Sequence, residues 1–379
     1  MKRSEHRILT THVGSLPGRS EAPQPGADSL PARQALRDII AQQREIGLDV
    51  INEGEYTKGG DWLSYINGRL AGFSPNPNPV GAVLTGGRDR EDFAEFYKYA
   101  AERGTLFYQS KGQTSVPRNY WICTGPVSYA GSAAMQHEID LFKAALQGVD
   151  ASEFFLTTTA PASLEPYYAA GYYKTTEEFV FALAEAMRVE YEMIANAGFL
   201  VQVDDAWLAA LWDRIGIKMG LEAFKKYCML RVEALNHALR NIPQDRIRYH
   251  LCWGSWHGPH AYDIPLADIV DVLLRVKAQG YSIEGANARH EHEYHVWEQV
   301  RLPGDKILIP GVVAHATDTI EHPDLVSERI QRYAKLVGRE RVIASTDCGF
   351  GERSHPQIAW AKLQALTQGA ERASKALWT

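Results

Sequence analysis

Residues 248–254 read Arg-Tyr-His-Leu-Cys-Trp-Gly, an apolar run that gives way to a glycine turn and carries an imidazole and a thiol near its end. Two similar runs follow, Tyr-Ser-Ile-Glu-Gly at 281–285 and Val-Ile-Ala-Ser-Thr-Asp-Cys-Gly at 342–349. Successive side chains of a strand point to opposite faces, so His250 and Cys252 are expected to point to the same side. One short strand can therefore supply two ligands to one site.

The ends of these runs carry the side chains that zinc prefers, namely thiolate, imidazole and carboxylate. We predict that one Zn²⁺ ion is held by His250, Cys252, Glu284 and Cys348. The alternative for Cys252 is a thiol packed in the core, since buried cysteine is common. The alternative for Glu284 is a carboxylate bonded to a neighbouring amide or arginine. The histidines within 290–295 are rival ligands, but their spacing suits a polar loop at the rim better.

Short β-rich runs alternate with helical patterns along the chain, which is typical of parallel βαβ units. Candidate strands end near Gly14, Glu53, Thr124, Thr158, Asp204, Cys252, Glu284, Val313 and Cys348. These are nine candidates for the eight places of an α/β (β/α)₈ TIM barrel, and we expect the run at 153–159 to be the extra element. Thr175 followed by acidic residues predicts the start of a helix over 176–197, and Gly198 predicts its end.

Length and composition agree with one barrel domain over residues 1–379. The chain of 379 residues exceeds a bare barrel of about 250 residues, which leaves room for insertions. Residues 72–113 contain Pro-Asn-Pro-Asn-Pro and several aromatic residues, and we predict that they form an insertion over the barrel mouth.

The charge pattern argues against several classes of partner. The net charge is −6 and no basic run occurs, so we expect neither nucleic acid nor a membrane as partner. No long uncharged apolar run is present, and four cysteines are too few for a disulfide scaffold, so a cytoplasmic location is expected.

A set of short motifs carries a family resemblance. Their order resembles that of the catalytic barrel of cobalamin-independent methionine synthase, and the motifs lie at 10–17, 51–55, 124–127, 201–205, 250–252, 283–284, 310–312 and 347–349. The chain is even more similar to the short single-barrel relatives of that synthase, a group that includes epoxyalkane:coenzyme M transferase. That likeness rests on residues 252–254, 258–260, 289–293, 321–326 and 347–351. The resemblance implies a uroporphyrinogen decarboxylase/methionine synthase-like barrel.

The resemblance also implies roles for individual residues. Ser15, Glu55 and Asp204 match residues that hold the carboxylate and amino groups of homocysteine in the synthase. His315 matches the histidine implicated there as the acid that protonates the leaving atom. Glu284 would be the zinc ligand that yields when the substrate sulfur binds. The alternatives are that Ser15 only shapes its turn and that His315 is a solvated loop histidine.

The function implied is zinc-dependent transfer of a methyl or alkyl group to a thiol, with homocysteine as the first-choice acceptor and methionine biosynthesis as the context. Addition of a thiol to an epoxide is the second hypothesis. A third, of another class, is a zinc-free decarboxylase or substrate-binding barrel. The expected partners are a small-molecule thiol and an alkyl donor, while a corrinoid protein and a homo-oligomer stay open. Residues 128–132 lack the tryptophan-bearing segment of the synthase, which argues against binding of a polyglutamylated folate.

Overall fold

The computed structural model describes all residues except 18–27, 59–61, 78–85, 107–118 and 352. Its centre is a sheet of eight strands in the order β1-β11-β10-β9-β8-β7-β5-β2, and each neighbouring pair runs parallel. The strands are β1 Leu9–Thr10, β2 Val50–Ile51, β5 Glu153–Thr159, β7 Leu200–Asp205, β8 Ile247–Leu251, β9 Gly280–Ile283, β10 Ile307–Val313 and β11 Ile343–Thr346. The strands form a nearly closed barrel, so the predicted (β/α)₈ fold is confirmed.

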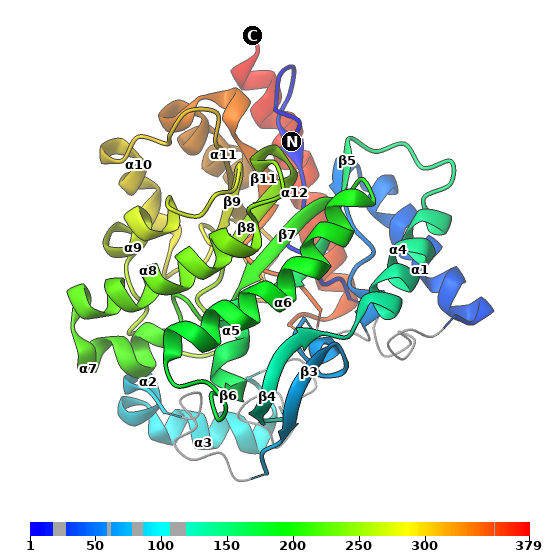
Figure 1. The fold of residues 1–379 in the computed structure, drawn as a ribbon. Coiled ribbons are helices and arrows are strands. Elements are labelled where there is room, and N and C mark those ends of the chain that lie inside the picture. The colour runs from blue at the N-terminus through cyan, green and yellow to red at the C-terminus, as the bar shows by residue number, and fades with distance from the viewer. Residues whose placement is uncertain (18–27, 59–61, 78–85, 107–118, 352) are drawn as a thin grey trace.

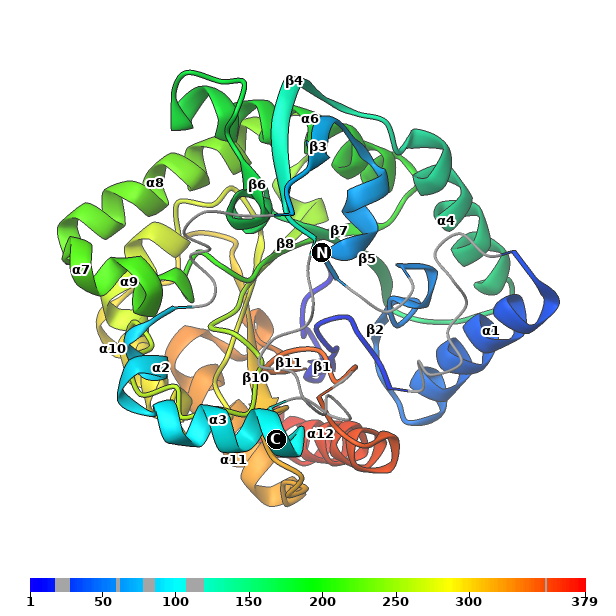
Figure 2. The ribbon, with the colours of Figure 1, turned by 90° about the horizontal axis from the view of Figure 1, so that it is seen from below.

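Helices surround the strands, as the view along the barrel shows (Figure 2). They are α1 Leu30–Glu45, α4 Ser132–Ala145, α6 Thr176–Asn196, α8 Leu221–Ala238, α9 Leu266–Leu273, α10 Val296–Gln299, α11 Pro323–Val337 and α12 Pro356–Leu377. The start predicted for α6 is confirmed: the Thr175 hydroxyl accepts from the Glu178 N–H, and the Glu178 carboxylate accepts from the Thr175 N–H. Among the described residues, no helix has the length and apolar character needed to cross a membrane.

The prediction for the extra strand was wrong. The run at 153–159 is β5, a barrel strand between β2 and β7, whereas the run ending near Thr124 belongs to β4, Trp121–Tyr129. β4 pairs antiparallel with β3, Leu70–Pro75, and alternates between exposed residues and residues that are mostly only partly buried. β5 is buried over its last five residues, because a parallel barrel strand is covered on both faces.

The excursion between β2 and β5 is longer than the predicted insertion. Residues 72–113 include most of β3 and the helices α2 (Arg88–Asp92) and α3 (Ala94–Arg103), but the hairpin continues through β4 to Tyr129. The parts at 78–85 and 107–113 lie outside the described residues. In Figure 1, α2 and α3 lie at the opposite end of the barrel from both termini. The Trp256 indole N–H in the loop after β8 donates to the Tyr97 hydroxyl of α3 at 2.9 Å, so α3 covers that end.

A buried charge network joins this hairpin to the helices. Arg69, 4% exposed, directly precedes β3 and donates to Glu138 of α4 and to Glu190 of α6, the latter at 2.9 Å. Glu190 also accepts from the Tyr129 hydroxyl of β4 at 2.5 Å. Burial opposes ionisation of Glu190, but the Arg69 charge, the Tyr129 hydrogen bond and the Lys58 charge together lower the pKa of that carboxyl.

Arg69→Met should therefore destabilise the fold strongly. The methionine fills the space but leaves the buried carboxylates without their cation, and removing one partner of a buried ion pair typically costs about 3–5 kcal/mol. The free energy of unfolding in urea is the measurement. The matched control is Arg188→Met on α6, whose guanidinium pairs with Glu185 and Glu192 at the surface. That change should cost at most about 1 kcal/mol. Equal losses in the two variants would contradict the role given to the buried network.

Candidate functional site

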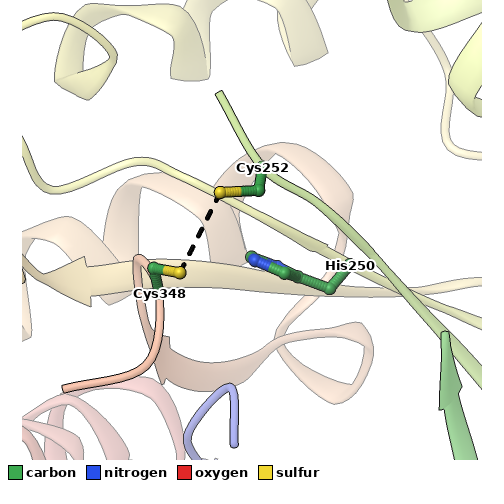
Figure 3. A group of neighbouring side chains, drawn as sticks. All are labelled: His250, Cys252 and Cys348. Atoms are coloured by element: carbon green, nitrogen blue, oxygen red, sulfur yellow. Dashed lines mark hydrogen bonds between the residues drawn. The ribbon is translucent and has the colours of Figure 1, made fainter. Parts of the chain in front are cut away.

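The ends of β8 and β11 bring three metal-binding side chains together. His250 lies in β8, Cys252 follows it directly, and Cys348 lies two residues beyond β11. One ligand atom from each lies within 4.8 Å of the others, and the two sulfurs are 3.9 Å apart (Figure 3). His250 and Cys252 are 2% and 5% exposed, whereas Cys348 is only partly buried. His250 and Cys252 thus lie on the same side, as their spacing predicts.

The geometry of this cluster fits a zinc ion. Two sulfurs that each lie about 2.3 Å from one tetrahedral zinc are roughly 3.8 Å apart, which matches the separation of Cys252 and Cys348. The Nδ1 atom of His250 lies 3.3 Å from the Ser282 hydroxyl, and its buried Nε2 has no hydrogen-bond partner among the described residues. A bound cation would satisfy this otherwise orphaned nitrogen.

The charges of the cluster favour a thiolate at Cys348. The hydrogen bond from the Cys252 thiol lowers the pKa of Cys348, and His250 lowers it further. The same hydrogen bond raises the pKa of Cys252. Burial opposes protonation of His250, but the nearby Cys348, Asp204 and Glu284 together outweigh burial and raise the pKa of the imidazole. These interactions favour negative charge on Cys348 over Cys252.

Glu284 follows β9 and is buried, but it lies outside the three-residue cluster. Its Oε1 accepts the Trp253 backbone N–H at 3.0 Å, and its Oε2 accepts the Asn287 side-chain amide at 2.7 Å. Burial raises the pKa of Glu284 to about 7. These contacts correspond to the amide-bonded alternative, and the ligand role of Glu284 stays a prediction.

Asp347 is a positioning residue that sequence reasoning missed. Its Oδ1 accepts the backbone N–H groups of Gly285 and Ala286 at 2.8 and 2.9 Å, and its Oδ2 accepts the Asn287 amide at 2.9 Å. A Cβ at Gly311 would lie 2.0 Å from Asp347 Oδ1, so glycine makes room for this carboxylate. The only sequence signal was the place of Asp347 at a strand end beside Cys348.

Ser15 lies beside the loop that carries Cys348. Its hydroxyl accepts the Gly351 N–H at 3.3 Å, and its carbonyl accepts the Phe350 N–H at 2.8 Å. A Cβ at Gly349 would lie 2.0 Å from Ser15 Oγ, so this close approach requires glycine. Ser15 thus shapes the meeting of two strand-end loops, in agreement with the simpler alternative, and its substrate role stays a prediction.

Glu55 and Asp204 place two buried carboxyls at the same end of the barrel. Glu55 adopts φ 61°, and its Oε1 accepts from the Thr157 hydroxyl at 3.2 Å. Asp204, the next-to-last residue of β7, lies beside His250 in register, and its Oδ1 accepts the Gln202 amide at 2.8 Å. Burial raises the pKa of Asp204 to about 7, His250 opposes that rise, and the Glu55 charge adds to it. Asp204 therefore interacts with the cluster through His250, and Glu55 interacts with Asp204.

Lys58 is a further residue that the sequence did not single out. It is 2% exposed, and its ammonium donates to the Thr157 hydroxyl at 2.7 Å and to the Thr157 carbonyl. It also lies 4.7 Å from the centre of the Tyr65 ring. This cation partly balances the buried carboxyls, and its charge lowers the pKa of Asp204.

His315 lies two residues beyond β10 and is 2% exposed, so it is not a solvated loop histidine. Its Nδ1 is buried without a hydrogen-bond partner among the described residues. Burial lowers the pKa of His315 to about 3, while the nearby Cys348 charge opposes that shift. His315 is therefore neutral near pH 7 and must first gain a proton before it can donate one.

The rival histidines do not join the cluster. His290 is buried and binds the carboxyls of Asp263 and Glu293 at 3.2 and 2.8 Å, and these partners raise its pKa to about 10 against the opposing effect of burial. The other two, His292 and His295, are exposed.

Comparisons with known proteins agree with the geometry. The family model described as "Cobalamin-independent synthase, Catalytic domain" matches residues 169–372. A methionine synthase of Thermococcus kodakarensis is 22% identical over 344 residues, which cover 89% of this chain and 83% of that protein. The 2-hydroxypropyl-CoM lyase of Xanthobacter autotrophicus is 24% identical over 226 residues, covering 53% of this chain and 56% of that protein. A solved B12-independent methionine synthase from a Shewanella species shares the fold, with a TM-score of 0.72 and 18% identity over 98% of this chain and 99% of that one.

Cys252→Ser and His250→Ala should each abolish tight binding of one zinc ion per chain, because both ligand atoms belong to the cluster. Glu284→Gln should keep most of the zinc, since the other three donors already converge and Glu284 has protein partners. Elemental analysis of protein purified without chelator measures the metal content. A Cys252→Ser variant that binds zinc as tightly as the unaltered protein would rule out this metal site.

Proposed function

Because the chain belongs to the family of the cobalamin-independent synthase catalytic domain, we propose that it is a zinc-dependent thiol S-alkyltransferase that moves a methyl or alkyl group to homocysteine. The observation that carries the proposal is the placement of His250, Cys252 and Cys348 beside the buried carboxyls of Glu55 and Asp204. One group of residues can bind a metal and the other can bind an ammonium. An amino acid that carries a thiol fits both.

The residues that would hold the ion are His250, Cys252 and Cys348, with Glu284 as the candidate for a labile fourth position. When bound, zinc stabilises the thiolate form of a coordinated substrate thiol and so makes the sulfur a nucleophile at neutral pH. The protein then has to align that sulfur with the electrophilic carbon and exclude competing nucleophiles.

The charge of the buried carboxyls favours homocysteine as the acceptor. Two carboxyls attract the ammonium of homocysteine, and an ammonium between them would relieve their mutual repulsion. A thiol that carries a sulfonate and no amino group would place a second anion near these groups. For this reason, methyl transfer to homocysteine is favoured over addition of a sulfonate-bearing thiol to an epoxide.

The proton balance assigns His315 a role. As a neutral imidazole it can accept the proton that the incoming thiol loses, and the Cys348 charge stabilises the imidazolium that results. His315 can then pass that proton to the atom that leaves the alkyl carbon. The new S–C bond forms as the bond to the leaving atom breaks, and the leaving atom takes the electron pair and the proton.

Asp204→Asn should weaken homocysteine binding by roughly 10- to 100-fold, because a charge-assisted hydrogen bond to the ammonium is lost. The comparison thiol is 4-mercaptobutyrate, which is homocysteine without its amino group. Its affinity should change little in this variant. Titration calorimetry with zinc-loaded protein measures both. Equal losses for the two thiols would remove Asp204 from the ammonium site.

His315→Ala should slow transfer by roughly 10²- to 10⁴-fold for donors whose leaving atom needs a proton. Donors with better leaving groups should lose less, because they need less protonation. Single-turnover rates across a donor series, followed by mass spectrometry of the methylated thiol, provide the measurement. Zinc content serves as the control and should stay unchanged. A uniform loss across the series would reassign His315 to a structural role.

A further inference from the structure

The loop after β8 folds back on the cysteine cluster through Gly254 and Ser255. Gly254 adopts φ +104°, and a Cβ there would lie 2.0 Å from the Trp256 ring, so only glycine fits this turn. The turn directs the Ser255 hydroxyl at Cys348, to whose sulfur it donates at 2.9 Å. Ser255 is 8% exposed, so water competes little for this hydrogen bond.

A site that activates a substrate thiol faces a problem of selectivity. The alkyl donor meets the substrate sulfur together with the sulfurs of Cys252 and Cys348, and each thiolate is a nucleophile. If Cys348 attacked, its S–C bond would form, the leaving group would depart with the electron pair, and the resulting thioether would bind zinc poorly. Cys348 is the less buried of the two cysteines, since Cys252 is 5% exposed and Cys348 only partly buried.

The two protein sulfurs receive different hydrogen bonds. Cys252 Sγ accepts the backbone N–H of Gly254 at 3.3 Å and lies 3.5 Å from the Ser255 hydroxyl. Cys348 Sγ has the shorter contact, 2.9 Å, from the hydroxyl itself. A donor on a thiolate stabilises its charge and occupies a lone pair that would otherwise attack carbon.

We propose that Ser255 is a positioning residue that protects Cys348 from alkylation and so directs the alkyl group to the substrate sulfur. The proposal rests on the function proposed above, because it assumes that an electrophilic alkyl donor reaches the zinc site. It assigns a selectivity role to one hydroxyl that binds neither substrate nor metal.

The test uses iodoacetamide as the electrophile on the zinc-loaded chain without any thiol substrate. Iodide leaves as the carbamidomethyl group bonds to sulfur, and peptide mass spectrometry gives the rate at Cys348. Ser255→Ala should raise that rate roughly tenfold, the effect of losing one charge-assisted hydrogen bond. Ser255→Thr keeps the hydroxyl and should react like the unaltered protein.

Two further variants distinguish the effect of the Ser255 hydroxyl from the effect of side-chain shape and from the loss of another buried hydroxyl. Ser255→Val has the shape of threonine without the hydroxyl, so its rate should be roughly tenfold above that of Ser255→Thr. This comparison does not depend on how well Ser255→Ala binds zinc. Ser345→Ala removes another buried hydroxyl, on β11, that has no hydrogen-bond partner among the described residues. Its rate at Cys348 should not change.

Equal rates for the threonine and valine variants, both with full zinc, would overturn the proposal. Zinc content is measured separately on the unaltered chain. A chain that binds no zinc would instead refute the proposed function, so the two failures are distinguishable.

Discussion

The hydrogen bonds that the Asp347 carboxylate accepts from the backbone of Gly285 and Ala286 hold the loop after β11 against the loop after β9. Cys348 is the next residue, so the same contacts fix where its sulfur lies. β8 pairs in parallel with β9, and His250 and Cys252 at the end of β8 lie close to the Cys348 sulfur. Without these hydrogen bonds, the loop that carries Cys348 would not be held in place, and the two sulfurs would not be kept at the separation that suits a metal ion.

Part of this site could be predicted from the sequence because strand geometry is local. The alternation of a strand places His250 and Cys252 on the same side from their spacing alone. The barrel followed from alternating strand and helix patterns, but β4 and β5 were exchanged because both runs are rich in residues that favour strands. Only tertiary packing distinguishes a half-exposed hairpin strand from a barrel strand covered on both faces.

The contacts that orient the ligands could not be predicted in this way. The sequence indicates that Glu284 stands at a strand end, but not that Trp253 and Asn287 hold its carboxylate. Similarly, Ser255 looks like an ordinary residue of a glycine turn until the positive φ of Gly254 directs it at Cys348. Such contacts depend on loop conformation and on distant segments, which local patterns do not encode.

Two groups of ionisable side chains lie at the same end of the barrel. In the proposed function, the cluster of His250, Cys252 and Cys348 binds a metal, and the neighbouring carboxyls of Glu55 and Asp204 bind an ammonium. Zinc X-ray absorption with and without homocysteine tests their combined role most directly. The account predicts two sulfur ligands from Cys252 and Cys348 in the free protein, and a third when homocysteine is added. An unchanged zinc shell at saturating homocysteine would contradict the account, because the metal would then have no part in activating the thiol.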